Sequence, residues 1–170
     1  MIEPYFLIFW AAWLTLLLLA ALRVSSFGAA RRWQDRKWKD HDHNEQAAAV
    51  IVAVKGFDIQ ATPRFFDTLL EQEYRNYRVI VCFESWDDPV ANWLQKNLEI
   101  SASNPTWSHP VHDSGLKSVT LVSAGPAQNE GQKVHNQIAA FRELKPEDKL
   151  IAFADADVVF KSNWLVQLLA

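Results

Sequence analysis

The feature that most constrains the fold of this chain is a short apolar stretch at residues 150–160, with the sequence LIAFADADVVF. Its length and its aliphatic and aromatic side chains predict a β-strand that is buried on both faces, as in a parallel sheet. Asp155 and Asp157 come at the carboxyl end of this strand. In an extended strand, residues i and i+2 share a face and lie roughly 6.6 Å apart, so the two carboxylates repel each other unless a cation lies between them.

A divalent cation would remove that repulsion. Mg²⁺ and Mn²⁺ prefer oxygen ligands, and they bind through one or two carboxylates together with the phosphates of a substrate. Ligands of α/β sheets bind outside the carboxyl ends of the strands. We therefore interpret Asp155 and Asp157 as metal ligands. The alternative is that one aspartate caps the next turn and the other is only solvated, because D-x-D spacing on its own is common.

From residue 47 onward, predicted strands alternate with predicted helices. The strands cover residues 47–54, 78–83, 118–123 and 150–160. The helices begin at about Thr62, Val90, Gly131 and Ser162, with Thr62 and Ser162 as caps and Pro63 as a first helical residue. Residues 101–116 carry Asn-Pro, His-Pro and Ser-Gly pairs, which predict a loop. The alternation predicts an α/β fold with a mainly parallel sheet.

Polar side chains with useful chemistry follow successive strands at the predicted carboxyl edge of the sheet. They are Lys55, Glu84, Asp87, Asp88, Lys133 and Asn136, and Gly56 is the turn residue beside Lys55. Carboxylates beside a ribose and base, lysines beside phosphates, and a metal held by D-x-D would together make a site for a nucleotide diphosphate. Each residue also has an ordinary structural interpretation, such as a turn at Gly56 or a helix start at Asp88.

The N-terminal part of the chain predicts a membrane anchor. Residues 5–22 contain no charged side chain, and a helix of that length spans about 27 Å, close to the thickness of the hydrocarbon core of a bilayer. A cleaved signal peptide is the alternative, but the basic segment that begins such peptides is missing. Basic residues cluster after the apolar segment, which predicts that the remainder is cytoplasmic, on the inner or plasma membrane. We therefore expect an anchor at residues 1–23, a basic linker at 24–46 and an α/β domain at 47–170.

Composition narrows the class of protein further. The chain has 170 residues and a formal net charge of −3, which gives no reason to expect a nucleic-acid partner. Cys82 is the only cysteine, so no disulfide forms within the chain. The sequence also lacks a glycine-rich phosphate-binding motif of the dinucleotide or P-loop type.

Three segments, taken in order, resemble a known family. They are Val54-Lys55-Gly56-Phe57-Asp58, residues 73–82 with the sequence EYRNYRVIVC, and Asp87-Asp88-Pro89. With the later D-x-D element they resemble ceramide glucosyltransferases and their bacterial relatives, which are glycosyltransferases of families 21 and 2. The resemblance runs from about residue 48 to 170. It implies a GT-A fold, a nucleotide-sugar donor such as a UDP-sugar, and a membrane lipid as acceptor.

The resemblance also implies roles for individual residues. Asp88 matches the family's first aspartate, which helps to bind the nucleotide, and Asp155 matches the second, with Asp157 completing the metal ligation. Lys133 and Asn136 match a Lys-x-x-Asn element that precedes the D-x-D strand. The family's third aspartate, the general base, and its Gln-x-x-Arg-Trp element come later than Asp157 and have no counterpart here.

The resulting expectation is the donor-binding half of a membrane-anchored hexosyltransferase that uses Mg²⁺ or Mn²⁺ and makes glycolipid. On this interpretation the 170-residue chain binds donor but does not turn over, because its general base is absent. Two alternatives stay open. One is a polysaccharide synthase that uses the same donor half, and the other is a non-catalytic, membrane-tethered module that binds nucleotide sugars.

Overall fold

The computed structural model describes residues 13, 15, 46–110 and 115–169. The chain divides into two units, Met1–Asp42 and His43–Ala170, and every element described below belongs to the second. In the described part of the chain, no helix is both long and apolar enough to cross a bilayer. The predicted anchor at residues 5–22 lies outside the described residues, apart from Trp13 and Thr15, which are helical.

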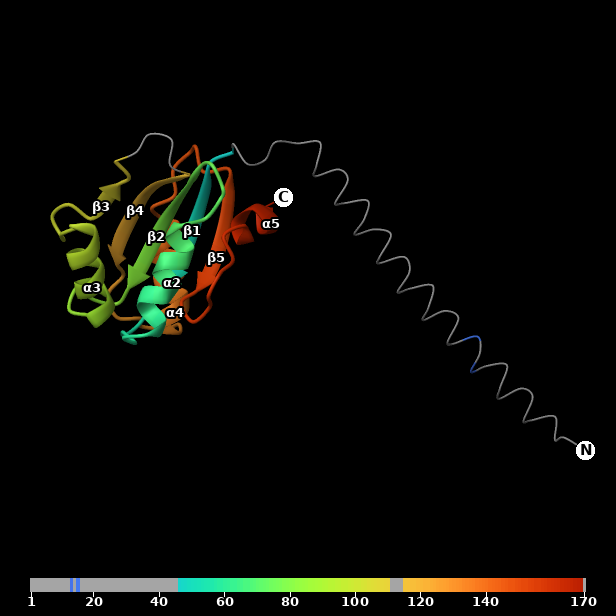
Figure 1. The fold of residues 1–170 in the computed structure, drawn as a ribbon. Helices are drawn as coiled ribbons and strands as arrows, with labels where there is room; N and C mark the ends of the chain where they lie inside the picture. Colours follow the sequence, from blue (N-terminus) through green and yellow to red (C-terminus); the bar gives the residue numbers. More distant parts are fainter. Residues whose placement is uncertain (1–12, 14, 16–45, 111–114, 170) are drawn as a thin grey trace, which may run out of the picture. The chain divides into compact units, whose positions relative to one another are not determined.

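A five-stranded, mostly parallel sheet forms the centre of the second unit (Figure 1). The strands are β1 (Ala48–Ala53), β2 (Tyr77–Phe83), β3 (Thr106–Ser108), β4 (Leu116–Ser123) and β5 (Leu150–Asp155). Their order across the sheet is β3-β4-β2-β1-β5, and only β3 runs antiparallel to its neighbour. The predicted mixed α/β fold with a mainly parallel, Rossmann-like sheet is confirmed.

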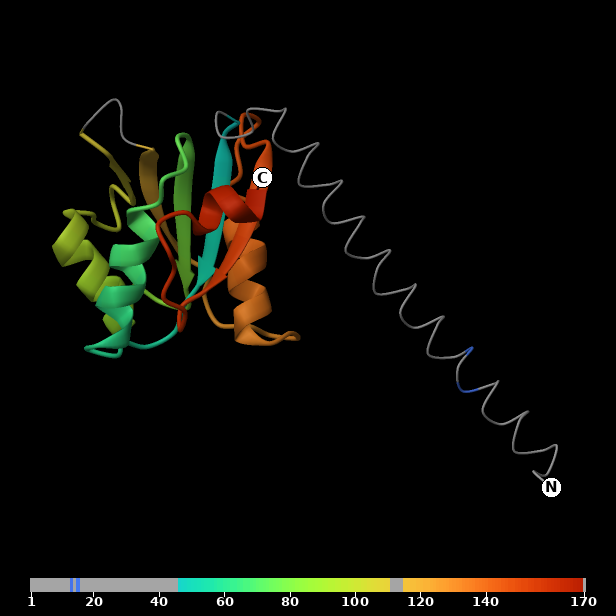
Figure 2. The same ribbon diagram turned by 45° about the vertical axis from the view of Figure 1, so that its right-hand side comes forward.

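Helices cover both faces of the sheet. They are α2 (Ala61–Leu70), α3 (Pro89–Leu98), α4 (Gln132–Phe141) and α5 (Trp164–Leu169). Side chains of α2, α3 and α5 pack into the larger apolar core on one face, and Ala140 of α4 packs into a smaller core on the other face. Figure 2 shows α2 in green and α4 in orange on opposite sides of the cyan strand β1. Layers on both sides explain why β1 and β2 are almost continuously apolar.

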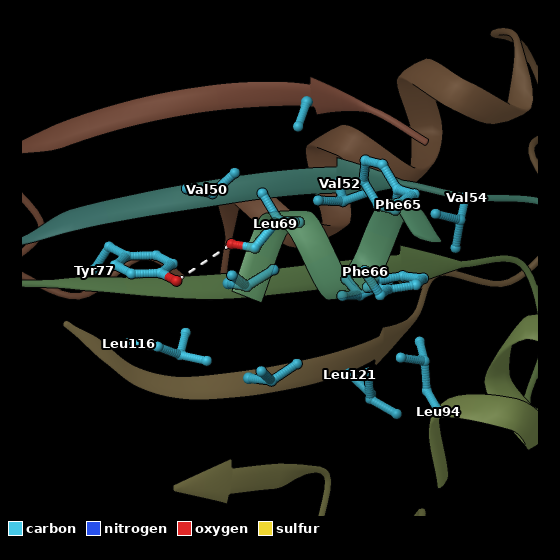
Figure 3. Close-up of a cluster of buried hydrophobic side chains, with 14 of the residues drawn as sticks. Val50, Val52, Val54, Phe65, Phe66, Leu69, Tyr77, Leu94, Leu116 and Leu121 are labelled. Atoms are coloured by element: carbon cyan, nitrogen blue, oxygen red, sulfur yellow. Dashed lines mark hydrogen bonds between the residues drawn. The ribbon is translucent and has the colours of Figure 1, made fainter. Parts of the chain in front are cut away.

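The larger core lies between α2 and the strands β1, β2 and β4. Val50 and Val52 alternate with side chains that face α4, so each strand contributes to both cores. Phe66 and Leu69 of α2 pack onto this face and are essentially inaccessible to solvent, as Figure 3 shows. Burying such side chains stabilises the fold by about 1.5–3 kcal/mol each.

A tyrosine hydroxyl forms hydrogen bonds at the carboxyl end of α2 inside this core. The Tyr77 hydroxyl donates to the Leu70 carbonyl (2.7 Å), lies 3.2 Å from the Leu69 carbonyl and accepts from the Gln72 N–H (3.2 Å); Figure 3 draws the contact with Leu69. The two carbonyls belong to the last turn of α2, where carbonyl groups have no partner within the helix. Burial raises the pKa of Tyr77 to about 12.

We expect Tyr77→Phe to lower the free energy of unfolding by about 1–2 kcal/mol, because it leaves a buried carbonyl and a buried N–H without a partner. Urea denaturation followed by circular dichroism measures the change. Ser108→Ala, which removes the hydroxyl of an exposed residue in β3, is the control. A loss below about 0.3 kcal/mol would show that water satisfies these groups.

The prediction for residues 150–160 is wrong in two respects. The strand β5 ends at Asp155, and residues 156 and 157 form a turn. β5 is also an edge strand, and it alternates between buried and more exposed residues instead of being buried on both faces. Ile151 and Phe153 are 37% and 53% exposed. They lie on the face of the sheet where α4 packs against the neighbouring strands β1 and β2. The apolar composition of this stretch does not distinguish an edge strand from a central strand. Only the order of strands in the sheet shows that β5 is at the edge.

Three smaller predictions also need correction. The N-cap residue of α2 is Gln60, not Thr62, and the Asp58 carboxylate accepts from the Gln60 and Ala61 N–H groups. The Thr62 hydroxyl instead accepts from the Asp58 N–H (3.0 Å), and the Ser162 hydroxyl, expected to cap the last helix, donates to Glu73. The predicted loop at residues 101–116 contains the short strand β3, and β4 begins within it at Leu116.

The apolar residues of α4 do not lie where an amphipathic pattern places them. Val134, Ile138 and Phe141 are all about half exposed, whereas Asn136 and Ala140 are buried. The sheet is therefore contacted by the small and polar face of α4. Close packing of the helix on β1 and β2 requires small side chains at that contact, which explains Ala140.

Candidate functional site

The strand order places a ligand-binding edge beside β1. From β1 the chain proceeds outward through β2 to β4, and α4 then returns it to β5 on the other side of β1. The order therefore reverses between β1 and β5. In open α/β sheets, ligands bind outside the carboxyl ends of the strands at this reversal.

A pocket of about 570 Å³ lies at that position. It is lined by the end of β1 and the turn that follows it, by the start of α2, by the start of α4 and by the turn after β5. The volume is within the usual range for small-molecule sites, about 300–1,000 Å³. Six of the predicted site residues line it, namely Lys55, Gly56, Lys133, Asn136, Asp155 and Asp157.

The Asp155 carboxylate faces a cation of the protein itself. Lys133 Nζ donates to it, and both side chains are 58% exposed. Repulsion between Asp155 and Asp157 favours a cation beside them, and in this structure Lys133 supplies one. An ion pair as exposed as this contributes little to stability, typically 0–1 kcal/mol. A ligand that offers Lys133 a phosphate and Asp155 a metal ion can therefore replace the pair at low cost.

Asn136 forms the floor of the pocket on the α4 side. Only 1% of it is exposed. Its side-chain amide lies 3.5 Å from the Val54 carbonyl, and its oxygen accepts from Gln132 Nε2 (2.8 Å). Gln132 also donates to the Gly125 carbonyl and accepts from the Ala127 N–H, both at 2.8 Å. The two amides thus connect α4 to the end of β1 and to the segment before α4.

Asp88 and Glu84 do not line the pocket, but each contacts a residue that does. Both oxygens of Asp88 accept from the Gly56 N–H (3.1 and 3.2 Å), and one of them also accepts from the Val90 N–H (3.0 Å) at the start of α3. Gly56 has a φ of +73°, which favours glycine. Asp88 thereby fixes the turn after β1, and Glu84 pairs with Lys55 at 3.3 Å.

A histidine fixes the segment that leads into α4. The His135 ring bonds to the Glu130 carboxylate and, through Nε2, to the Ala124 carbonyl (3.0 Å). The hydrogen bond to Glu130 is the main cause of a raised pKa of His135, and the same contact lowers the pKa of Glu130. Protonation of His135 therefore strengthens the attachment of this segment, which carries Gln132 and Lys133 into the pocket.

Several pocket residues were missed at the level of sequence. They are Phe57, Asp58, Thr62 and Gln132. Gln132 had a signal, because it lies one turn before Asn136 on the same helix, where side-chain pairs meet. Phe57 and Asp58 directly follow Gly56 and belong to the segment 54–58 that carries the family resemblance, but no site role was assigned to them.

The chemistry of the pocket suits a cation such as Mg²⁺ or Mn²⁺ only together with a phosphate ligand. Among the described residues, no group of three or more His, Cys, Asp or Glu side chains is arranged to hold a metal ion. Asp155 and Asp157 nevertheless line one pocket, and two carboxylates fit a metal that takes its other ligands from water and substrate phosphates. The residues present therefore fit a metal–phosphate complex better than a bare metal.

Comparison with known proteins adds no assignment. No protein-family model matches the chain, and no curated protein sequence matches it.

Proposed function

We propose that this chain binds a nucleotide sugar, with a UDP-sugar as the first candidate, and that it is the donor-binding part of a membrane-anchored glycosyltransferase with a lipid acceptor. The observation that carries the proposal is the pocket at the strand-order reversal, which is lined by Lys55 and Lys133 and by three carboxylates, those of Asp58, Asp155 and Asp157. This combination of charges complements a nucleotide diphosphate with its metal ion.

Each side of the pocket has a part in the proposal. Asp155 and Asp157 hold Mg²⁺ or Mn²⁺, and Lys133 moves from Asp155 to a phosphate. Lys55 supplies a second positive charge at the end of β1. Asn136 and Gln132, which are fixed by their mutual hydrogen bond, keep α4 in place. The metal ion would offset the negative charge of the leaving diphosphate.

The finer parts of the proposal rest on the sequence. They are the GT-A type of the fold, the anchor at residues 5–22 and the cytoplasmic position of the α/β domain. The resemblance to family 2 and 21 glycosyltransferases supports the transfer of a hexose, and the α/β sheet with its pocket is compatible with it. We assign no general base to a residue of this chain.

Isothermal titration of the full 170-residue chain, kept in mild detergent because residues 5–22 are apolar, tests the proposal. We expect UDP to bind in the presence of Mn²⁺ and binding to disappear with EDTA. Lys133→Met should weaken binding of UDP with Mn²⁺ by about 10-fold or more, because a charge-assisted contact to phosphate is lost. Lys96→Met, which changes a lysine outside the pocket, is the matched control.

Two results would overturn the proposal. One is UDP binding that is equally tight with EDTA and with Mn²⁺, because the metal would then have no role. The other is the absence of any UDP binding at millimolar concentration in a chain whose circular dichroism shows the folded α/β domain.

A further inference from the structure

The turn that carries Asp157 has little internal support. β5 ends at Asp155, and the Val158 N–H reaches the Asp155 carbonyl only at 3.4 Å. Asp157, Val158 and Val159 are all exposed. Something outside the turn must therefore fix the position of Asp157 if this side chain is to bind a ligand with defined geometry.

The α2 region supplies that support a few residues further along the chain. The Phe160 N–H donates to the Thr68 hydroxyl (3.2 Å). Gln72 binds the same segment at two points, because its Nε2 donates to the Lys161 carbonyl and its Oε1 accepts from the Leu165 N–H, both at 2.9 Å. These contacts join parts of the chain that are about 90 residues apart in sequence.

The side chains of Thr68 in α2 and of Gln72 just after it are themselves held in place. Gln72 is 7% exposed and also donates to the Thr68 carbonyl (2.7 Å). The Thr68 hydroxyl donates to the Phe65 carbonyl (3.1 Å) while it accepts from Phe160. The Phe160 ring packs against Phe65 and stacks on Trp164, with ring centres 5.8 and 4.1 Å apart. The segment that begins at Phe160 is therefore held against α2 by apolar packing and by hydrogen bonds.

We propose that Thr68 and Gln72 are positioning residues for the nucleotide site: they hold Phe160 and Lys161 against α2 and so fix Asp157, three residues earlier, in the pocket. The inference rests on the proposed function, since it concerns the same metal–phosphate ligand. Neither residue lines the pocket, so each acts through the turn. Removal of groups that orient metal ligands typically costs 10–100-fold in metal affinity or activity.

Thr68→Val and Thr68→Ser distinguish the effect of the Thr68 hydroxyl from the effect of its packing. Valine keeps the shape of threonine but has no hydroxyl, and serine keeps the hydroxyl. We expect Thr68→Val to weaken Mn²⁺-dependent UDP binding about 10-fold, whereas Thr68→Ser stays within about two-fold of the wild type. Thr106→Val, in the edge strand β3 outside the pocket, is the matched control.

Hydrogen exchange by mass spectrometry on the same full-length variants gives a readout that does not depend on a ligand. Peptides that cover residues 156–163 should exchange faster in Thr68→Val and at the wild-type rate in Thr68→Ser. Peptides from β2 should be unchanged in both, because their hydrogen bonds lie within the sheet.

The outcomes distinguish this inference from the proposed function. A wild-type chain that fails to bind UDP with Mn²⁺ overturns the function and this inference with it. A wild-type chain that binds, with Thr68→Val binding equally well, overturns the inference alone. An equal loss of binding in Thr68→Ser also overturns it, because the hydroxyl would then not be the cause.

Discussion

Replacing Asp148 by alanine is expected to lower the free energy of unfolding of the α/β domain by about 3 kcal/mol, because it leaves a buried guanidinium without its counter-ion. Arg78, at the start of β2, reaches the turn between α4 and β5. Its Nε lies 2.9 and 3.2 Å from the two Asp148 oxygens, and its Nη2 donates to Asp148 and to the Glu143 carbonyl. The two side chains are 8% and 2% exposed.

Urea denaturation of the full chain in mild detergent, followed by circular dichroism, measures this change. Asp67→Ala is the control, since Asp67 is an exposed residue of α2 and surface substitutions usually stay within ±0.5 kcal/mol. A loss below about 1 kcal/mol for Asp148→Ala would mean that water or another side chain takes over the charge of Arg78.

The same pair has a pH signature. Burial by itself raises the pKa of Asp148, but the hydrogen bonds from Arg78 and from the Lys145 N–H outweigh it and hold the pKa below its ordinary value. The stabilisation is therefore fully present above the unfolded-state pKa of about 3.9. It is lost as the pH falls through the lower pKa of the folded state. The difference in stability between the wild type and Asp148→Ala should shrink below about pH 4.

Local sequence pattern was sufficient to predict six of the residues that line the pocket. Lys55 follows β1 and Asp155 is the last residue of β5, and parallel strands present their carboxyl ends at one edge. Lys133 belongs at the same edge because a helix that connects parallel strands begins there. These placements depend only on strand periodicity and chain direction, which are local properties.

The parts that sequence could not predict depend on neighbours that are distant in the chain. The stretch at residues 150–160 is apolar whether the strand is central or at an edge, and only the return through α4 places β5 outside β1. The sequence predicted that Asp88 helps to bind a nucleotide. Here its carboxylate is occupied by the N–H groups of Gly56 and Val90, and no local pattern reports a contact across 32 residues.

The contacts that hold the segment after Asp157 also depend on residues that are distant in the chain. Gln72 looks in sequence like a polar residue at the end of an amphipathic helix, which is normally solvated. It is buried because the segment after β5 folds back over α2 and presents backbone groups to it. A buried amide whose oxygen and nitrogen are both satisfied by another segment fixes that segment. Only the fold shows this.

Replacing Asp157 by asparagine is the sharpest test of the pocket chemistry, and we expect it to weaken Mn²⁺-dependent UDP binding about 100-fold, equivalent to about 2.7 kcal/mol. Asparagine keeps the size of the side chain and one oxygen, so the loss reports the negative charge. Among the described residues Asp157 has no ion-pair partner, whereas Asp155 is paired with Lys133. Asp155→Asn therefore also removes the ion-pair partner of Lys133, whereas Asp157→Asn leaves that ion pair intact.

Calorimetric titration with UDP at fixed Mn²⁺ measures this loss, and Asp67→Asn, an exposed carboxylate outside the pocket, is the control. Because Asp157 is exposed and does not belong to the core, the variant should unfold at the same urea concentration as the wild type. A loss of affinity with unchanged stability then assigns the charge of Asp157 to the ligand. Unchanged affinity would place the metal elsewhere, and binding by Lys133 and Lys55 to the phosphates alone would be the remaining explanation for a nucleotide in this pocket.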